Sequence, residues 1–423
     1  MKSIRVSGDF DDNIYGEILS RLPVKSLVRF KCVSKGWQSM ISNDNYFIDL
    51  HLSRTKTRSS SSTLFVIVRT AEERTVVSMD LLNDVPAVIR FPIQLTRQEG
   101  ILKPVNGLIC SYYKDFDLGR TAVCIRNFMT REETPWIEVP TENTKKKVYF
   151  QTIEHGFGFD VTTKEHKVIS IRQTHIKASG KMFCYIVCKV MNVGRKHYSA
   201  WRMIDDFPAY MIQGNGIFVN RSLYWLGRNS IPTSNCQNKS HTKYIGRLSQ
   251  VIVAFDVPTE QFRSIPIPNF IMNQTDGMYS FKSRIVYIIE VDGHIALIDQ
   301  LENIQIAKLW IFDEDGSGHQ KIAANATIGS RDGNWIEETI LMPFGHSELY
   351  LYFFESITGT NKLVIRMSMV NTTFYTLYLY DRENKTFMQV EISGMPRNIC
   401  APSDLVANFT ESLLPVPKKQ QEQ

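Results

Sequence analysis

The segment that decides the fold of the N-terminal region is Glu17-Ile-Leu-Ser-Arg-Leu-Pro-Val-Lys-Ser-Leu-Val-Arg-Phe-Lys-Cys-Val-Ser-Lys-Gly-Trp37. It places three helix-sized apolar blocks within about half the length that an independent domain needs. A segment this short does not bury a complete core by itself. We therefore expect a small helical module that completes its core with a partner.

Local sequence rules divide this module into three short helices. The first block has the three- and four-residue spacing of one helix face, in Ile14, Ile18, Leu19 and Leu22. Pro23 disfavours helical geometry at the residue before it and suits the first turn of a second helix, which we expect to run through Lys31. Ser34 is a candidate N-cap for a third helix that carries Trp37.

The charge of the module is one-sided. No acidic residue occurs from Ile18 to Asn43, and the basic residues in this range include Arg21, Lys25, Arg29, Lys31 and Lys35. An acidic partner surface would be favoured by this excess. The same pattern fits equally well a helical cap that buries its apolar face on the rest of the chain and leaves its basic side chains in water.

Composition places the chain among ordinary soluble globular proteins. It has 423 residues, of which 43% are hydrophobic and 22% charged, with a formal charge of +6 that gives no specific indication of nucleic-acid binding. No segment has the pattern of a membrane span or a signal peptide. Seven cysteines without a Cys-x-x-Cys pair indicate free thiols in a reducing compartment, so we expect the cytoplasm, the nucleus or both.

The larger part of the chain has the pattern of antiparallel sheet. The polar stretch 54–63 is predicted to be a linker, the β domain to cover 64–410, and 411–423 to be a flexible tail. One pattern recurs at Asp160, Asp256 and Asp381: a strand ends in Asp, a polar turn follows, and the next strand begins. Together with looser copies at 80, 127 and 299, its spacing predicts an irregular β-propeller of six to eight blades, with a large β-sandwich or stacked sheets as the alternative.

Signatures of catalysis and of bound cofactors are missing from the sequence. Gly156-Phe-Gly158 lacks the third glycine and the acidic residue of a dinucleotide site, so we expect these glycines to serve a turn or bulge. The histidines show no metal-binding spacing. We therefore predict no enzyme, no cofactor and no metal.

The segment 8–53, with the Glu17 to Trp37 run at its centre, closely resembles the plant-type F-box. The resemblance implies three helices that bind the Skp-type adaptor of a cullin-based ubiquitin ligase. The residues placed where that family has adaptor contacts or F-box core are Ile14, Ile18, Leu19, Leu22, Pro23, Leu27, Cys32, Val33 and Trp37. Where family members open the first helix with Leu-Pro, this chain has Phe10 and Asp11.

The β domain resembles the F-box-associated domain, which is related in pattern to kelch-type propellers. The resemblance is carried by Val105-Asn-Gly-Leu-Ile-Cys-Ser111, His155-Gly-Phe-Gly-Phe-Asp160 and Gly216-Ile-Phe-Val-Asn-Arg-Ser-Leu-Tyr-Trp-Leu226. It implies a subunit that recruits an unidentified protein target for ubiquitination, with no nucleic-acid or membrane partner. A scaffold outside any ligase, or a propeller that binds carbohydrate or another small ligand, would fit the same residues.

Overall fold

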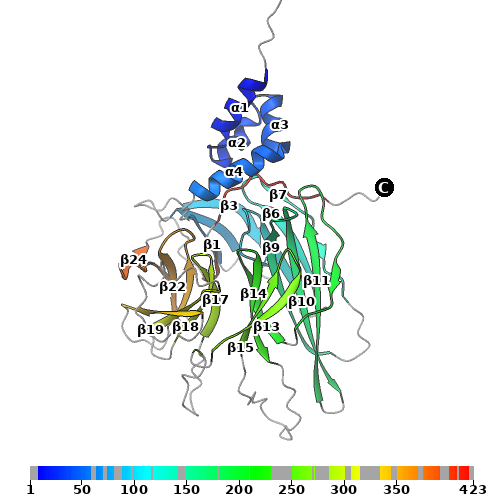
Figure 1. Ribbon diagram of the computed structural model, residues 1–423, viewed down its shortest axis with the longest axis vertical. Helices are drawn as coiled ribbons and strands as arrows, with labels where there is room; N and C mark the ends of the chain where they lie inside the picture. Colours follow the sequence, from blue (N-terminus) through cyan, green and yellow to red (C-terminus); the bar gives the residue numbers. More distant parts are fainter. Residues whose placement is uncertain are drawn as a thin grey trace, which may run out of the picture.

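The chain forms a small helical module seated on a large all-β domain (Figure 1). In this computed structural model the residues described are 8–58, 63–69, 74–80, 88–96, 99–115, 118–141, 148–178, 181–208, 210–229, 250–268, 271, 285–300, 306–314, 334–343, 350–369, 375–390, 400–406 and 409–418. The side chains of Phe10 and Asp11 lie outside the described residues, although both positions belong to the first helix.

The module contains four helices: α1 (Gly8–Leu19), α2 (Val24–Phe30), α3 (Lys35–Asn43) and α4 (Asn45–Arg58). The first three confirm the predicted helices, and Ser34 caps α3 by accepting the backbone N–H of Trp37 at 3.1 Å. The fourth helix was not predicted, and its last turn occupies the first half of the predicted linker. Asp44 starts α4 by accepting the N–H groups of Tyr46 and Phe47.

In the described residues the β domain contains six antiparallel sheets. Their orders are β25-β1-β2-β3, β4-β5-β6-β7 with β8 also on β6, β12-β11-β10-β9, β13-β14-β15-β16, β17-β18-β19-β20 and β21-β22-β23-β24. The strands are β1 (Thr63–Arg69), β2 (Arg74–Asp80), β3 (Val88–Leu95), β4 (Glu99–Ile101), β5 (Ile109–Asp115), β6 (Arg120–Asn127), β7 (Glu132–Glu133), β8 (Ile137–Glu138), β9 (Val148–Asp160), β10 (Glu165–Ala178), β11 (Lys181–Val193), β12 (Arg202–Ile204), β13 (Tyr210–Val219), β14 (Ser222–Asn229), β15 (Gln250–Asp256), β16 (Gln261–Pro266), β17 (Ile285–Val291), β18 (His294–Gln300), β19 (Ile306–Phe312), β20 (Trp335–Leu341), β21 (Tyr350–Ser356), β22 (Lys362–Met369), β23 (Tyr375–Asp381), β24 (Thr386–Val390) and β25 (Cys400–Val406). Neighbouring sheets meet along their first strands β9, β13, β17 and β21, as the blades of a propeller do.

The predicted number of blades, six to eight, is wrong for the described residues. Five sheets are four-stranded blades, and the sixth, built from β4 to β8, is irregular. Its outer edge is divided between two-residue strands on either side of Pro135, which has no N–H to donate to a ladder. The predicted mark at Asp299 also falls inside β18 rather than at a turn.

The propeller is closed by its last strand. Strand β25 pairs antiparallel with β1, so residues 400–406 complete the sheet that residues 63–95 begin. This pairing joins the two ends of the β domain, and the ring therefore depends on contacts between residues more than 300 positions apart in sequence.

The recurrent Asp turn is confirmed at all three of its clearest positions. Asp160, Asp256 and Asp381 each accept turn N–H groups two or three residues further on. In each turn the fourth residue after the Asp has a positive φ, at Lys164, Glu260 and Lys385. Asn127 builds the same turn with its side-chain oxygen, and Arg131 has the positive φ.

The C-terminal residues correct the prediction of a flexible tail. Residues 409–418, which we call the C-terminal strap, run between the helices and the propeller (Figure 1), and Phe409, Leu413, Leu414 and Val416 are buried there. The Asn127 side chain donates hydrogen bonds to the carbonyls of Ser412 and Leu414 at 3.0 and 2.9 Å. Gly107 permits the close approach, since a Cβ on it would lie 2.4 Å from the Ser412 Cβ. Residues 419–423 lie outside the described residues.

Asn127 serves the turn and the strap together, and substitutions separate these two roles. We expect Asn127→Ala to lower the free energy of unfolding by about 2 to 4 kcal/mol, because it leaves buried carbonyl and amide groups without partners. Asn127→Asp keeps the turn acceptor but faces the two strap carbonyls with a group that cannot donate. Chemical denaturation of both variants checks this, and an Asp variant as stable as wild type would show that the strap bonds contribute nothing.

Candidate functional site

The nine residues predicted to bind the adaptor or to form the F-box core fall into three groups in the structure. Leu19 and Leu27 are buried, and Leu22 and Trp37 are partly buried. The exposed ones are Ile14, Ile18, Pro23, Cys32 and Val33. The buried and partly buried residues can therefore form the core of the module. Only the exposed residues can contact a partner without a rearrangement of the module.

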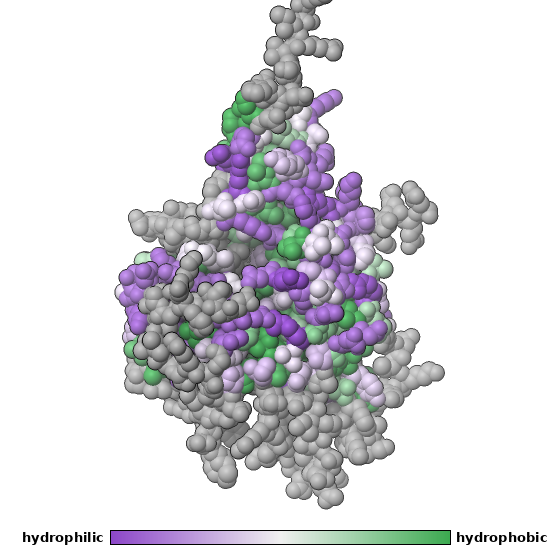
Figure 2. All heavy atoms as spheres, viewed as in Figure 1, coloured by the Kyte–Doolittle hydropathy of each residue, from purple (hydrophilic) through white to green (hydrophobic). Residues whose placement is uncertain are grey.

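Helix α1 presents an apolar face to solvent. Ile14, Tyr15 and Ile18 are 47%, 43% and 55% exposed, and Figure 2 shows apolar surface over α1 at the end of the molecule far from the propeller. Val33, after α2, is 60% exposed. Large exposed apolar side chains gathered on one helix are the usual mark of a protein-binding surface.

An aromatic cluster supports this face from below. The Trp37 ring lies 5.8 Å from the Tyr15 ring and 5.6 Å from the Phe30 ring, so α1, α2 and α3 meet at one side chain. Tyr15 was not singled out from the sequence. Its aromatic character and its position next to Ile14 were the signals that could have found it.

The end of α1 is held by α4. The Arg54 guanidinium donates to the Glu17 carbonyl at 3.0 Å, to the Glu17 carboxylate at 2.6 Å and to the Ser20 hydroxyl. The hydrogen bond from Arg54 lowers the pKa of the Glu17 carboxyl. The positive charge of Arg54 thus compensates the partial negative charge at the C-terminus of α1. These contacts also fix the orientation of α1 and of its apolar face.

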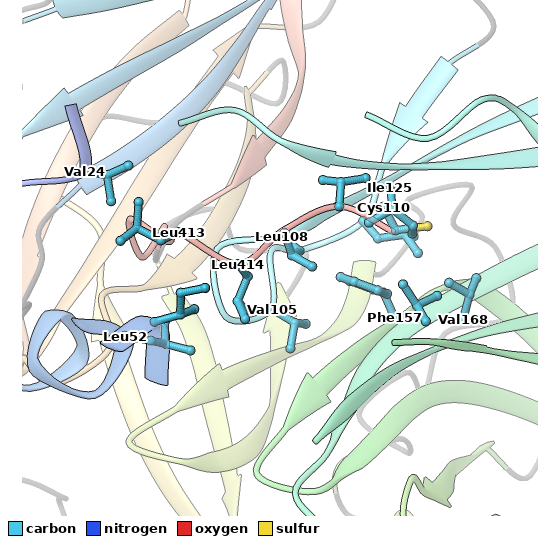
Figure 3. Packing of buried hydrophobic residues seen from close by; sticks show 14 of the residues in the cluster. Val24, Leu52, Val105, Leu108, Cys110, Ile125, Phe157, Val168, Leu413 and Leu414 are labelled. Atoms are coloured by element: carbon cyan, nitrogen blue, oxygen red, sulfur yellow. The ribbon is translucent and has the colours of Figure 1, made fainter. Parts of the chain in front are cut away.

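The core beneath the face continues into the propeller. Figure 3 shows Val24 and Leu52 of the helices beside Leu413 and Leu414 of the strap, and these beside Val105 and Leu108 of the β domain. The Glu411 carboxylate accepts the N–H of Val24 at 3.0 Å, at the start of α2. The helical module therefore completes its core largely within this chain, and α1 still presents apolar side chains to solvent.

Polar contacts hold α4 on the third sheet. Asp49 is paired with Arg195 and, at 3.5 Å, with Lys164, and Arg195 also donates to the Asn45 side chain at 2.8 Å. Beneath them His166 is buried between the Phe157 and Phe159 rings and shares a 3.1 Å hydrogen bond with the Val105 carbonyl. The orientation of the module on the propeller is thus fixed by hydrogen bonds as well as by packing.

The basic residues of the module remain on its surface. Arg21, Lys25, Arg29 and Lys35 are exposed, and Lys31 is partly buried. Within the described residues, Arg21 alone among these five forms an ion pair, at 3.6 Å with Glu17. The cationic surface predicted from the sequence is therefore present beside the apolar face.

The described residues contain no group of three or more His, Cys, Asp or Glu side chains that could hold a metal ion. Cys32, Cys110, Cys124, Cys184 and Cys188 are free thiols. None of the described helices is long and apolar enough to cross a membrane.

Comparisons with known proteins agree with this architecture. Residues 9–49 match the family model of the F-box domain, and residues 59–413 match that of the F-box associated beta propeller domain. The second match covers most of the chain, so the chain belongs to the family of F-box proteins with an F-box-associated β-propeller.

Curated relatives come from Arabidopsis thaliana. F-box protein At2g15640 is 29% identical over 89% of this chain and 87% of its own length, and F-box protein DOR is 25% identical over 90% and 87%. Among solved structures, the β-propeller domain of the Trilobed protease from Pyrococcus furiosus has 10% identity, a TM-score of 0.33 and coverage of 77% and 89%. A TM-score this low supports no conclusion about fold or activity.

Two buried histidines make stability depend on pH. Burial lowers the pKa of His166 to about 4 and that of His155 to about 3, below the 6.5 of an unfolded chain. Below pH 6.5 the unfolded state therefore binds more protons, and stability falls as the pH is lowered. We expect His166→Gln to reduce the slope of unfolding free energy between pH 6.5 and 5 by about 1 kcal/mol per pH unit.

Denaturation curves across this pH range measure the slope for wild type and variant. His155→Gln is the matched comparison, because its ring is equally buried but lies away from the helical module. It should reduce the slope by a similar amount, and the double variant by the sum. An unchanged slope in His166→Gln would contradict the assignment of a neutral, buried ring.

Proposed function

We propose that this protein is the substrate-recognition subunit of a cullin-based ubiquitin ligase, in which the helical module binds a Skp-type adaptor and the propeller binds a protein target. The observation that carries the proposal is the exposed apolar face of α1, supported from below and flanked by basic side chains. A partner with a complementary apolar groove and acidic rim would bury Ile14 and Ile18 and neutralise the neighbouring charges.

The protein would act by position rather than by its own chemistry. Adaptor and cullin would bring charged ubiquitin, and the propeller would hold the lysines of the target near it. Holding two reactants at a fixed separation raises their effective concentration without a catalytic side chain. The strap supports this role, because it holds the adaptor-binding face in one orientation relative to the propeller.

A scaffold outside any ligase is the second candidate. The observation in its favour is the Phe10 and Asp11 pair, which replaces the Leu-Pro entry usual in the family. Such a protein would keep the propeller surface and lose the adaptor. We further propose that the protein works in the cytoplasm, the nucleus or both, in keeping with the free thiols.

Capture of the adaptor distinguishes these two functions. Tagged full-length chain in plant cell extract should recover a Skp-type adaptor together with a cullin. Ile14→Asp with Ile18→Asp should reduce that recovery at least about tenfold, because two carboxylates would have to be desolvated in an apolar contact. Neither substitution reaches the buried core, so the fold should be kept.

Leu341→Asp with Met203→Asp is the matched control, since both side chains are more than half exposed on the propeller. It should leave adaptor recovery unchanged. Equal recovery with the α1 variant and wild type would refute the proposed face, and no adaptor with wild type would favour the scaffold.

A further inference from the structure

The third sheet is longer than the other sheets and extends away from the helices. Strands β9, β10 and β11 have 13, 14 and 13 residues, whereas the other strands have ten or fewer. The turn between β9 and β10 lies at the helical module, where Lys164 meets Asp49. The opposite end of the sheet extends past the neighbouring strands on the far side of the propeller (Figure 1).

Exposed apolar side chains gather at this projecting end. Val148 and Tyr149 at the start of β9 are 39% and 65% exposed, and Tyr185 of β11 is 45% exposed. Leu118, in the neighbouring turn between β5 and β6, is 65% exposed. We call these four residues the hairpin patch.

Strand register places the members of the hairpin patch together. Tyr185 is opposite Thr174, which is opposite Gln151, and Val148 is opposite Ile176. Because side chains alternate between the two faces of a sheet, Val148 and Tyr185 lie on the same face as Arg172 and Thr174. The Arg172 guanidinium donates to the Gly119 carbonyl at 2.6 Å, which holds the turn that carries Leu118 against this face.

The surroundings of the hairpin patch are basic. Lys177 and Lys181 lie in β10 and β11 at this end of the sheet, three further lysines immediately precede Val148 in the sequence, and no Asp or Glu occurs from residue 166 to residue 204. The carboxylates described nearby are already engaged: Glu154 is paired with Lys114 at 3.2 Å, and Asp115 accepts the N–H of Leu118 at 2.9 Å. A ligand bound here meets apolar contacts within a positive field.

We propose that the hairpin patch binds an acidic segment of the target protein that carries aromatic or aliphatic side chains. This rests on the proposed function, because it names the surface and the partner chemistry of the target-binding domain. A polypeptide fits better than a nucleic acid, since Leu118 and Val148 are aliphatic and offer no ring on which bases could stack. The Tyr149 ring is also set edge-on to Phe150, with 70° between the ring planes.

Peptide display on the full-length chain tests the proposal. The probe is a library of short random peptides, and the enriched peptides should contain more Asp and Glu than the library together with at least one large apolar residue. Binding of an enriched peptide, followed by fluorescence anisotropy, should weaken with added salt. Tyr149→Ser and Tyr185→Ser should each raise its Kd about tenfold.

Leu341→Ser with Met388→Ser is the matched control, because these exposed apolar residues lie on other sheets. It should leave the Kd unchanged, and thermal unfolding should show that all variants remain folded. Three results would overturn the proposal: enriched peptides without an acidic excess, equal binding by the tyrosine variants, or competition by a single-stranded oligonucleotide that depends on the same tyrosines.

Adaptor capture by the same variants separates this proposal from the proposed function. Tyr149→Ser and Tyr185→Ser should recover the adaptor as wild type does, because α1 is unaffected. If both tyrosine variants bind the peptide with an unchanged Kd and recover the adaptor normally, only the proposal for the hairpin patch is refuted. Wild type that recovers no adaptor refutes the ligase role alone.

Discussion

The structure depends on the packing of the C-terminal strap between the helices and the propeller. The helical module is too short to bury its own core, and Leu413 and Leu414 supply part of what it lacks. Side chains satisfy much of the strap's backbone: the Asn127 amide donates to two of its carbonyls, and the Glu132 carboxylate accepts the N–H of Val416. Apolar burial and hydrogen bonding thus act on the same ten residues, which joins the last part of the chain to the first.

Features set by local chemistry could be predicted from the sequence. The helices α1 to α3 follow from apolar spacing, Pro23 and Ser34, and the turns at Asp160, Asp256 and Asp381 follow from the affinity of a carboxylate for nearby amides. The sequence also indicated α4, since Phe47, Ile48 and Leu52 are spaced along one helix face. The polar C-terminal part of this helix, from Arg54 on, was instead predicted to be the start of a linker. The apolar run from Leu413 to Val416 was likewise a signal against a flexible tail.

What could not be predicted depends on contacts between distant parts of the chain. Gly156 was expected in a turn or bulge, yet it lies in the middle of β9, where a Cβ would come within 2.6 Å of the Trp225 ring from the next sheet. The second sheet is irregular because the short strands β7 and β8 both pair with β6. The spacing of residues along the sequence does not show which strands will pair. In the candidate site, Ile18 and Leu19 are adjacent and equally apolar, and only the packing of α1 makes one exposed and the other buried.

The third sheet gives the two proposed binding surfaces a physical connection. At one end its β9–β10 turn and Arg195 hold α4 through Asp49, and at the other it carries the hairpin patch. Beside the β9–β10 turn Lys167 binds Asp160 and Glu260 at 3.1 and 2.7 Å, which ties the sheet to its neighbour. Continuous hydrogen-bonded strands resist bending along their length, so a target held at the hairpin patch would keep a constant distance from α1. A receptor that works by position requires this constancy, because its contribution to the rate lies in keeping the reacting groups within reach of each other.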